Sequence, residues 1–94
     1  MTSARSPYSL VLSPGVRRQL AEVLPTAVAF AAHEFIVGPL LENPERSGKR
    51  LGEPMADCHS ARQGTYRVVY CIDAVARVVT VLQVAHRSDI YRSR

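Results

Sequence analysis

Tryptophan is absent from this chain of 94 residues, and cysteine occurs only twice, at Cys58 and Cys71. Secreted domains held together by disulfides usually carry more cysteines at closer spacing, so we expect a protein of the reducing cytoplasm. No apolar run approaches the roughly 20 residues that span a membrane, and the N-terminus lacks the apolar core of a signal peptide. We therefore expect no membrane association.

Several motifs of catalytic and cofactor sites are also missing. The sequence has no glycine-rich phosphate loop and no serine framed as a nucleophile elbow. Cys58 and His59 are adjacent, and no further Cys/His pair stands at zinc-site spacing. We therefore expect neither a metal nor an organic cofactor.

The length and composition indicate one folded domain over residues 1–94, with residues 1–7 as a flexible N-terminus. Hydrophobic residues make up 47% of the chain, which excludes a disordered tail.

Positive charge is concentrated in the second half. Residues 1–45 carry three arginines against four glutamates, whereas residues 46–94 carry nine basic against four acidic side chains. Only Lys49 among the twelve basic residues is not arginine, and arginine binds phosphate bidentately. This asymmetry favours a nucleic acid or an acidic protein as partner. A GC-rich genome, which favours arginine codons, is the alternative explanation.

The pattern predicts an α+β domain in which an N-terminal short strand and a helical hairpin pack on a small antiparallel sheet. Ser13 and Pro14 predict a helix start, Pro25 its end, and Thr26 the cap of a second helix. Gly38-Pro39 predicts a break in that helix, with one more turn at Leu40 and Leu41 as the alternative. The expected elements are strand 8–12, helices 14–24 and 26–37, loop 43–54, strand 59–62, a tight turn at Gln63-Gly64, strand 64–73, turn 73–77 and strand 78–85. The last three strands should form a meander. The edge that the first strand joins stays open. The expected helical core positions are Val16, Leu20, Val23, Leu24, Val28, Ala31, Phe35 and Ile36, with Arg17, Arg18, Gln19 and Glu22 on the solvent side.

Strand 64–73 is apolar except for Arg67, so we expect it inside the sheet with both faces covered. Side chains alternate along a strand, so Val68, Tyr70 and Ile72 should share one face. Arg67, Val69 and Cys71 should share the other. A strand arginine usually pairs with a carboxylate or reaches water. The alternative is a guanidinium aimed at phosphate.

Arg67 begins this strand and Arg87 follows the next, so a hairpin around residues 73–77 brings them together. His86 and Tyr91 should lie close by, with Arg62 across the earlier turn. Arginines, a histidine and a phenol suit metal-free phosphodiester cleavage, in which arginine stabilises negative charge and histidine moves protons. Chemistry alone still favours anion binding over catalysis. Three further basic residues, Arg46, Lys49 and Arg50, cluster in loop 43–54, and such clusters are most often simply solvated.

Three segments resemble the RelE toxins of bacterial type II toxin–antitoxin pairs: Pro44 to Leu51, Tyr66 to Tyr70, and Val84 to Arg92. The resemblance covers nearly the whole chain and implies a RelE-like fold. It also implies a ribosome-dependent endonuclease that cuts A-site codons of mRNA by attack of the ribose 2′-hydroxyl on the adjacent phosphate.

On this resemblance Arg67 contacts the scissile phosphate, Arg87 stabilises the transition state or protonates the leaving oxygen, and Tyr91 stacks on the base. Arg62, Arg46, Lys49 and Arg50 are expected to bind RNA. The family's lysines before the central strand are missing here, which makes His86 a candidate proton-transfer group. Adjacent strand residues point to opposite faces, so His86 shares the cleft of Arg87 only if the strand ends or bulges at Ala85. A histidine packed beneath the helices is the alternative.

The implied partners are a small cognate antitoxin, the ribosome with its mRNA, and operator DNA through the antitoxin only. Two other functions stay open: a ParE-like inhibitor of DNA gyrase, and a weak or inactive toxin-like domain that binds an antitoxin as a co-repressor.

Overall fold

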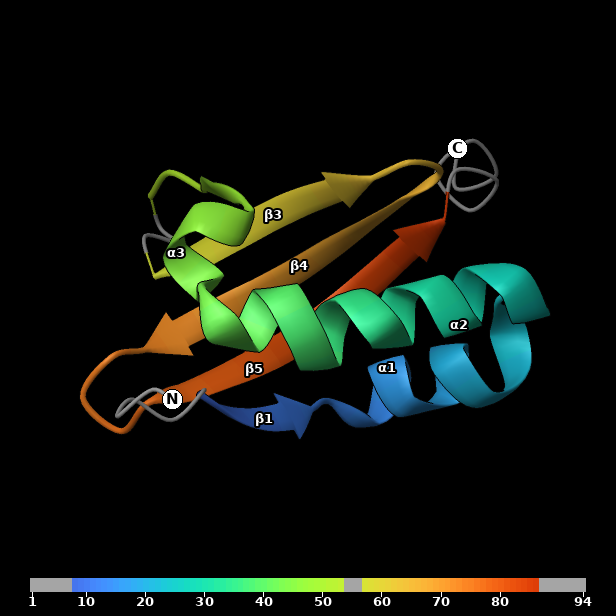
Figure 1. Cartoon of the computed structure of the whole chain (residues 1–94), viewed down its shortest axis with the longest axis horizontal. Coiled ribbons are helices and arrows are strands. Elements are labelled where there is room, and N and C mark those ends of the chain that lie inside the picture. Colours follow the sequence, from blue (N-terminus) through green and yellow to red (C-terminus); the bar gives the residue numbers. More distant parts are fainter. Residues whose placement is uncertain (1–7, 54–56, 87–94) are drawn as a thin grey trace, which may run out of the picture.

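The computed structural model describes residues 8–53 and 57–86. It contains a five-stranded sheet with helices packed on one face, which confirms the predicted α+β class (Figure 1). The expected flexible N-terminus and two candidate site residues, Arg87 and Tyr91, lie outside the described residues. The strands are β1 (Ser9–Leu12), β2 (Lys49–Arg50), β3 (Cys58–Gln63), β4 (Tyr66–Asp73) and β5 (Val78–His86). The helices are α1 (Pro14–Arg18), α2 (Thr26–Phe35) and α3 (Pro44–Ser47), with π-helical segments η1 (Gln19–Val23) and η2 (Ile36–Leu40).

The sheet has the order β1-β5-β4-β3-β2, so β4 is central as predicted. Antiparallel pairing of β3 with β4 and of β4 with β5 confirms the meander. The first strand, whose edge the sequence left open, runs parallel to β5, with Ser9 opposite Val78. The β3–β4 turn consists of Gly64 and Thr65, one residue later than predicted. Gly64 has a φ of +63°, which L side chains rarely adopt.

The first helix begins as predicted. Ser13 is its N-cap, and its hydroxyl accepts a hydrogen bond from the backbone N–H of Val16. Gln19, expected in solvent, instead contacts β5. Its amide donates to the carbonyl of Val84 at 2.6 Å and accepts from the Val84 N–H at 3.0 Å, so it occupies the edge of β5 beyond the end of β1. Val23, expected in the core, is 54% exposed.

The second helix differs from the prediction at both ends. Thr26 is its first residue and not its cap, since the N-cap is Pro25. The break expected at Gly38-Pro39 is wrong, because the helix continues through η2 with Pro39 inside it. A wider π turn accommodates a residue that lacks a backbone donor. Within α2, Ala32 is fully buried, whereas Ala31, expected in the core, is exposed.

The segment expected as a loop after residue 43 is ordered into α3 and β2. Backbone N–H groups of Arg46 and Ser47 both donate to the carbonyl of Asn43, which closes the short helix. The Tyr70 hydroxyl donates to the carbonyl of Pro44 at 2.7 Å and ties α3 to the sheet. A Cβ at Gly48 would lie 2.7 Å from the carbonyl oxygen of Ser60, so this close approach requires glycine.

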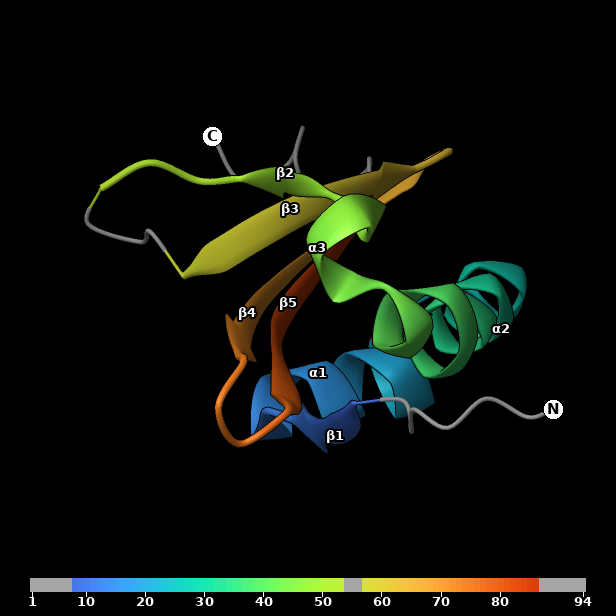
Figure 2. The same cartoon turned by 60° about the vertical axis from the view of Figure 1, so that its left-hand side comes forward.

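The core lies between the helices and one face of the sheet. Fully buried side chains from both layers meet there: Val16, Ala32, Leu40, Val68, Tyr70, Val79, Val81 and Val84. Among the described residues no helix covers the opposite face of the sheet (Figure 2). In the described part of the chain, helices cover only one face of the central strand, whereas we expected cover on both. Arg67, Val69 and Cys71 on the opposite face are half-buried.

Cys58 and Cys71 lie opposite each other on β3 and β4 and form a disulfide, which the sequence analysis did not predict. The two bonded residues differ in exposure, since Cys58 is buried and Cys71 half-buried. In the described part of the chain, no helix is both long and apolar enough to cross a membrane.

Candidate nucleic-acid interface

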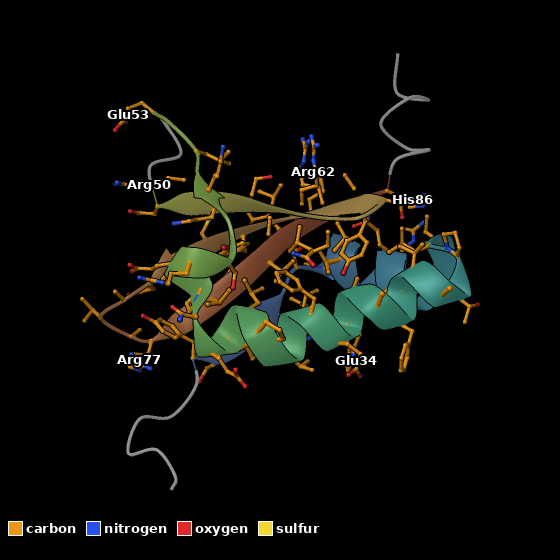
Figure 3. The ribbon with its side chains drawn as sticks, turned by 45° about the horizontal axis from the view of Figure 1, so that its top comes forward. Glu34, Arg50, Glu53, Arg62, Arg77 and His86 are labelled. Carbon is orange, nitrogen blue, oxygen red and sulfur yellow. A yellow bond between two sulfur atoms is a disulfide. The ribbon has the colours of Figure 1, made fainter. Side chains whose placement is uncertain are left out.

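The sheet face without helices, which we call the open face, presents two directly opposed arginines. Arg62 of β3 pairs in register with Arg67 of β4, so both side chains project from the same face. Arg62 is exposed and Arg67 half-buried. Figure 3 shows Arg62 pointing away from the helices (Figure 3). The structure thus brings these two predicted site residues together.

Opposed like charges on neighbouring strands destabilise a sheet by up to about 1 kcal/mol. A pair that only served the fold would be expected to carry opposite charges or apolar groups. The register places two more polar groups on the open face: Lys49 opposite Ser60 on β2, and Gln83 opposite Val69 on β5. Arg67 itself faces Ala85, whose small side chain leaves room beside the guanidinium. The open face can therefore bind a polyanion along the strands.

The predicted cluster of Arg46, Lys49 and Arg50 is divided by the structure. Only Lys49 is placed on the open face by its register. Arg50 pairs with His59, so alternation turns it to the other side, and Arg46 lies exposed on α3. The three residues do not form one patch.

His86 does not join the two arginines. It lies opposite Tyr66, a residue buried on the helix-covered face. The prediction required the strand to end or bulge at Ala85. Strand β5 instead continues to His86, and the irregularity in its pairing with β4 lies at Leu82. The structure therefore favours the alternative in which His86 packs on the helical side.

Two tyrosines of β4 serve the fold. The Tyr66 hydroxyl donates to the carbonyl of Ala31 on α2, and that of Tyr70 donates to Pro44. Burial raises the pKa of Tyr66, and it raises the pKa of Tyr70 to about 12. Both phenols therefore stay protonated at neutral pH and act as hydrogen-bond donors to the helices. No group of three His, Cys, Asp or Glu side chains within residues 8–53 and 57–86 could hold a metal ion.

A family model described as the ParE toxin of type II toxin–antitoxin systems matches residues 10–91 of this chain. The chain belongs to the RelE/ParE superfamily of type II toxins. Toxin RelE of Mycobacterium tuberculosis is 44% identical over 92% of this toxin and 88% of its own length. Toxin RelG of the same organism is 43% identical over 92% of this toxin and 98% of its own length.

Among solved structures, this toxin resembles one from the toxin–antitoxin complex RelBE2 of M. tuberculosis. The TM-score is 0.80 at 40% identity, covering 87% of this toxin and all of the compared chain. The comparison confirms the RelE-like fold that the three sequence segments predicted.

Proposed function

We propose that this toxin cleaves mRNA in the A site of translating ribosomes. The observation that best supports this proposal is the opposed pair of Arg62 and Arg67 on the open face of the sheet. Phosphodiester groups repeat along an RNA strand, and two neighbouring guanidinium groups can bind one phosphate or two successive ones. Relatives that carry the names RelE and RelG support the same assignment.

In the proposed reaction the ribose 2′-oxygen attacks the adjacent phosphorus and loses its proton. The bond from phosphorus to the 5′-oxygen of the next nucleotide breaks, and that oxygen takes up a proton. The products are a 2′,3′-cyclic phosphate and a 5′-hydroxyl. Arg67 binds the scissile phosphate and stabilises the negative charge that grows on its oxygens. Arg62 and Lys49 hold the flanking backbone.

The remaining roles come from the resemblance. Arg87 is proposed to act on the leaving oxygen or the transition state, and Tyr91 to stack on the base. Both lie outside the described residues. Proton transfer by His86 stays a prediction whose geometric requirement the register does not support. Two arginines without a complete acid–base pair act slowly on free RNA, so the ribosome is proposed to position the substrate.

The proposed protein partner is a small antitoxin, as in the RelBE2 complex that a related toxin forms. An acidic antitoxin segment would neutralise the open face, and operator DNA would be contacted only through the antitoxin. Because the proposed ribosomal substrate and the antitoxin are cytoplasmic, we propose that the toxin acts in the cytoplasm. In a compartment that keeps thiols reduced, the disulfide between Cys58 and Cys71 would be reduced to two thiols.

The test uses purified ribosomes programmed with a defined mRNA. Primer extension should reveal cleavage within the A-site codon, with little cleavage of the same mRNA without ribosomes. Arg67→Ala should reduce the rate at least about 100-fold, the scale for removing one preorganised group that stabilises transition-state charge. Arg17→Ala removes an exposed arginine on α1 and should retain the wild-type rate. Equal cutting of naked RNA, or equal loss in both variants, would contradict the proposal.

Inhibition of DNA gyrase is a second candidate, because the matching family model carries the ParE name. Pulse labelling after induction separates the two functions. Methionine incorporation should stop first under our proposal, whereas early arrest of thymidine incorporation indicates gyrase. If neither stops, the co-repressor alternative remains, and antitoxin-dependent binding to operator DNA would support it.

A further inference from the structure

A second candidate site lies where β3 begins and β4 ends, at the end of the sheet away from the Gly64 turn. A cavity of about 730 Å³ opens there between α3, β2 and the start of β3. Its lining includes Glu45, Asp57 and Asp73, together with Arg50 and His59. Three carboxylates against one guanidinium make this cavity negative, in contrast to the basic open face.

His59 is an independent indication of a ligand. Its side chain is only 8% exposed, it stacks on the ring of Tyr70 with centroids 5.4 Å apart, and it lines the cavity. Its Nδ1 is buried and has no hydrogen-bond partner in the described part of the chain. Buried polar atoms are rarely left without a partner, so this ring is a polar part of the cavity wall that the described fold does not satisfy.

The walls of the cavity are held firmly. The carbonyl of Asp57 accepts a hydrogen bond from the N–H of Ile72 at 3.1 Å, beside the Cys58–Cys71 disulfide. One oxygen of Asp73 accepts from the N–H of Ala76 at 3.0 Å, which fixes this carboxylate at the β4–β5 turn. Glu45 follows Pro44, whose carbonyl is bound by the Tyr70 hydroxyl. The Asp73 carboxylate and the backbone that carries Asp57 and Glu45 are thus positioned before any ligand arrives.

These carboxylates do not converge closely enough for a metal, since no described trio of His, Cys, Asp or Glu could hold an ion. A larger cation with several N–H donors can reach groups spread around a cavity of this size. We propose that the cavity binds a guanidinium or primary ammonium group carried on a flexible chain. An arginine or lysine side chain of a protein and a free aliphatic polyamine share this chemistry. The proposal is independent of RNA cleavage.

The experiment is a ¹⁵N NMR titration of the whole chain with two probes, agmatine and the peptide acetyl-Gly-Arg-Gly-amide. Saturable shifts are expected at the amides of Asp57, His59, Asp73 and Thr80, and binding should weaken as salt rises. Glu45→Gln and Asp57→Asn should each weaken binding about tenfold, the effect of losing one hydrogen bond to a charged group.

The matched control is Glu34→Gln on α2, which lies away from Arg50 (Figure 3) and does not line the cavity. It should leave binding within about twofold, because a distant exposed charge acts only through screened solvent. His59→Phe keeps a ring against Tyr70 but removes both ring nitrogens, so it should weaken binding, and unchanged binding would count against the proposed site. Thermal unfolding of each variant shows that the fold is kept.

The two probes distinguish the sources of the cation. Binding of the peptide alone indicates a protein side chain, and binding of agmatine alone indicates a polyamine. The proposal is overturned if neither probe saturates by about 20 mM, or if Glu45→Gln and Glu34→Gln have the same effect. Neither ribosomes nor RNA enter this assay, so its failure leaves the proposed cleavage untouched.

Discussion

Removing either member of the opposed arginine pair should stabilise the fold while it slows cleavage. The perturbation is Arg62→Gln, Arg67→Gln and the double variant. Glutamine keeps a polar side chain of moderate length on the open face, so the variants differ from the wild type mainly in charge. A residue retained for the fold would show the opposite behaviour.

The magnitude follows from the register. Directly opposed side chains have Cβ atoms about 5 Å apart, and two guanidinium groups that splay to about 7 Å repel by roughly 0.6 kcal/mol in water. Partial burial of Arg67 raises this value, and physiological salt lowers it. We therefore expect about 0.5 kcal/mol of stabilisation, or roughly 2–4 °C in Tm for a domain of this length.

The assay is thermal unfolding followed by circular dichroism at low and high salt, with Arg17→Gln as a matched control on α1. Because each single substitution already removes the repulsion, the double variant should gain little more, and the cycle should show a coupling of about 0.5 kcal/mol. The coupling should shrink as salt rises. A loss of more than about 1 kcal/mol in either single variant would refute the reasoning and make that arginine a structural partner.

Four other substitutions or conditions test the rest of the structure. Replacing Cys58 and Cys71 with alanine should lower the free energy of unfolding by about 3 kcal/mol relative to the oxidised protein, as measured by denaturant unfolding. This is the chain-entropy estimate for a disulfide whose cysteines are 13 residues apart. Gly48→Ala should cost about 1–3 kcal/mol in the same assay, because its Cβ would meet the backbone of β3 and the Tyr70 hydroxyl. The raised pKa of Tyr70 stabilises the fold below pH 10, where the phenol is neutral in both states, and this contribution should be lost as pH rises from 10 to about 12. Tyr70→Phe should flatten that part of the pH–stability curve. His86→Gln should keep the wild-type cleavage rate and pH profile. A rate loss together with a changed pH profile would restore His86 as a proton-transfer candidate.

The β3–β4 hairpin shows which features the sequence could predict. A turn placed at Gln63-Gly64 instead of Gly64-Thr65 shifts every cross-strand partner by two residues. Alternation has a period of two, so each side chain keeps its face, and the common face of Arg62 and Arg67 was predictable despite the error. The disulfide was not, because the shifted register places Cys58 opposite Val69. A one-residue correction at the turn would have revealed it.

The helical half shows a different limit. Local signals defined the start at Ser13 and the end near Pro25, because capping and proline chemistry act within a few residues. Gly38-Pro39 looked like a break, yet packing of Ile36 and Leu40 in the core holds the chain helical through it. Gln19 looked like a solvent residue because its partner on β5 is 65 residues away in the chain. Tertiary contacts of this kind leave no local trace.

The two faces of the sheet differ in what their side chains do for stability. The helix-covered face places Tyr66 and Tyr70 beneath the helices, where their hydroxyls bind backbone carbonyls and hold the layers together. The open face keeps opposed positive charges that weaken the sheet. A small domain tolerates that weakness only if the covered face supplies enough stability elsewhere. This unfavourable pairing is the reason for our proposal that the two arginines bind an anion outside the chain.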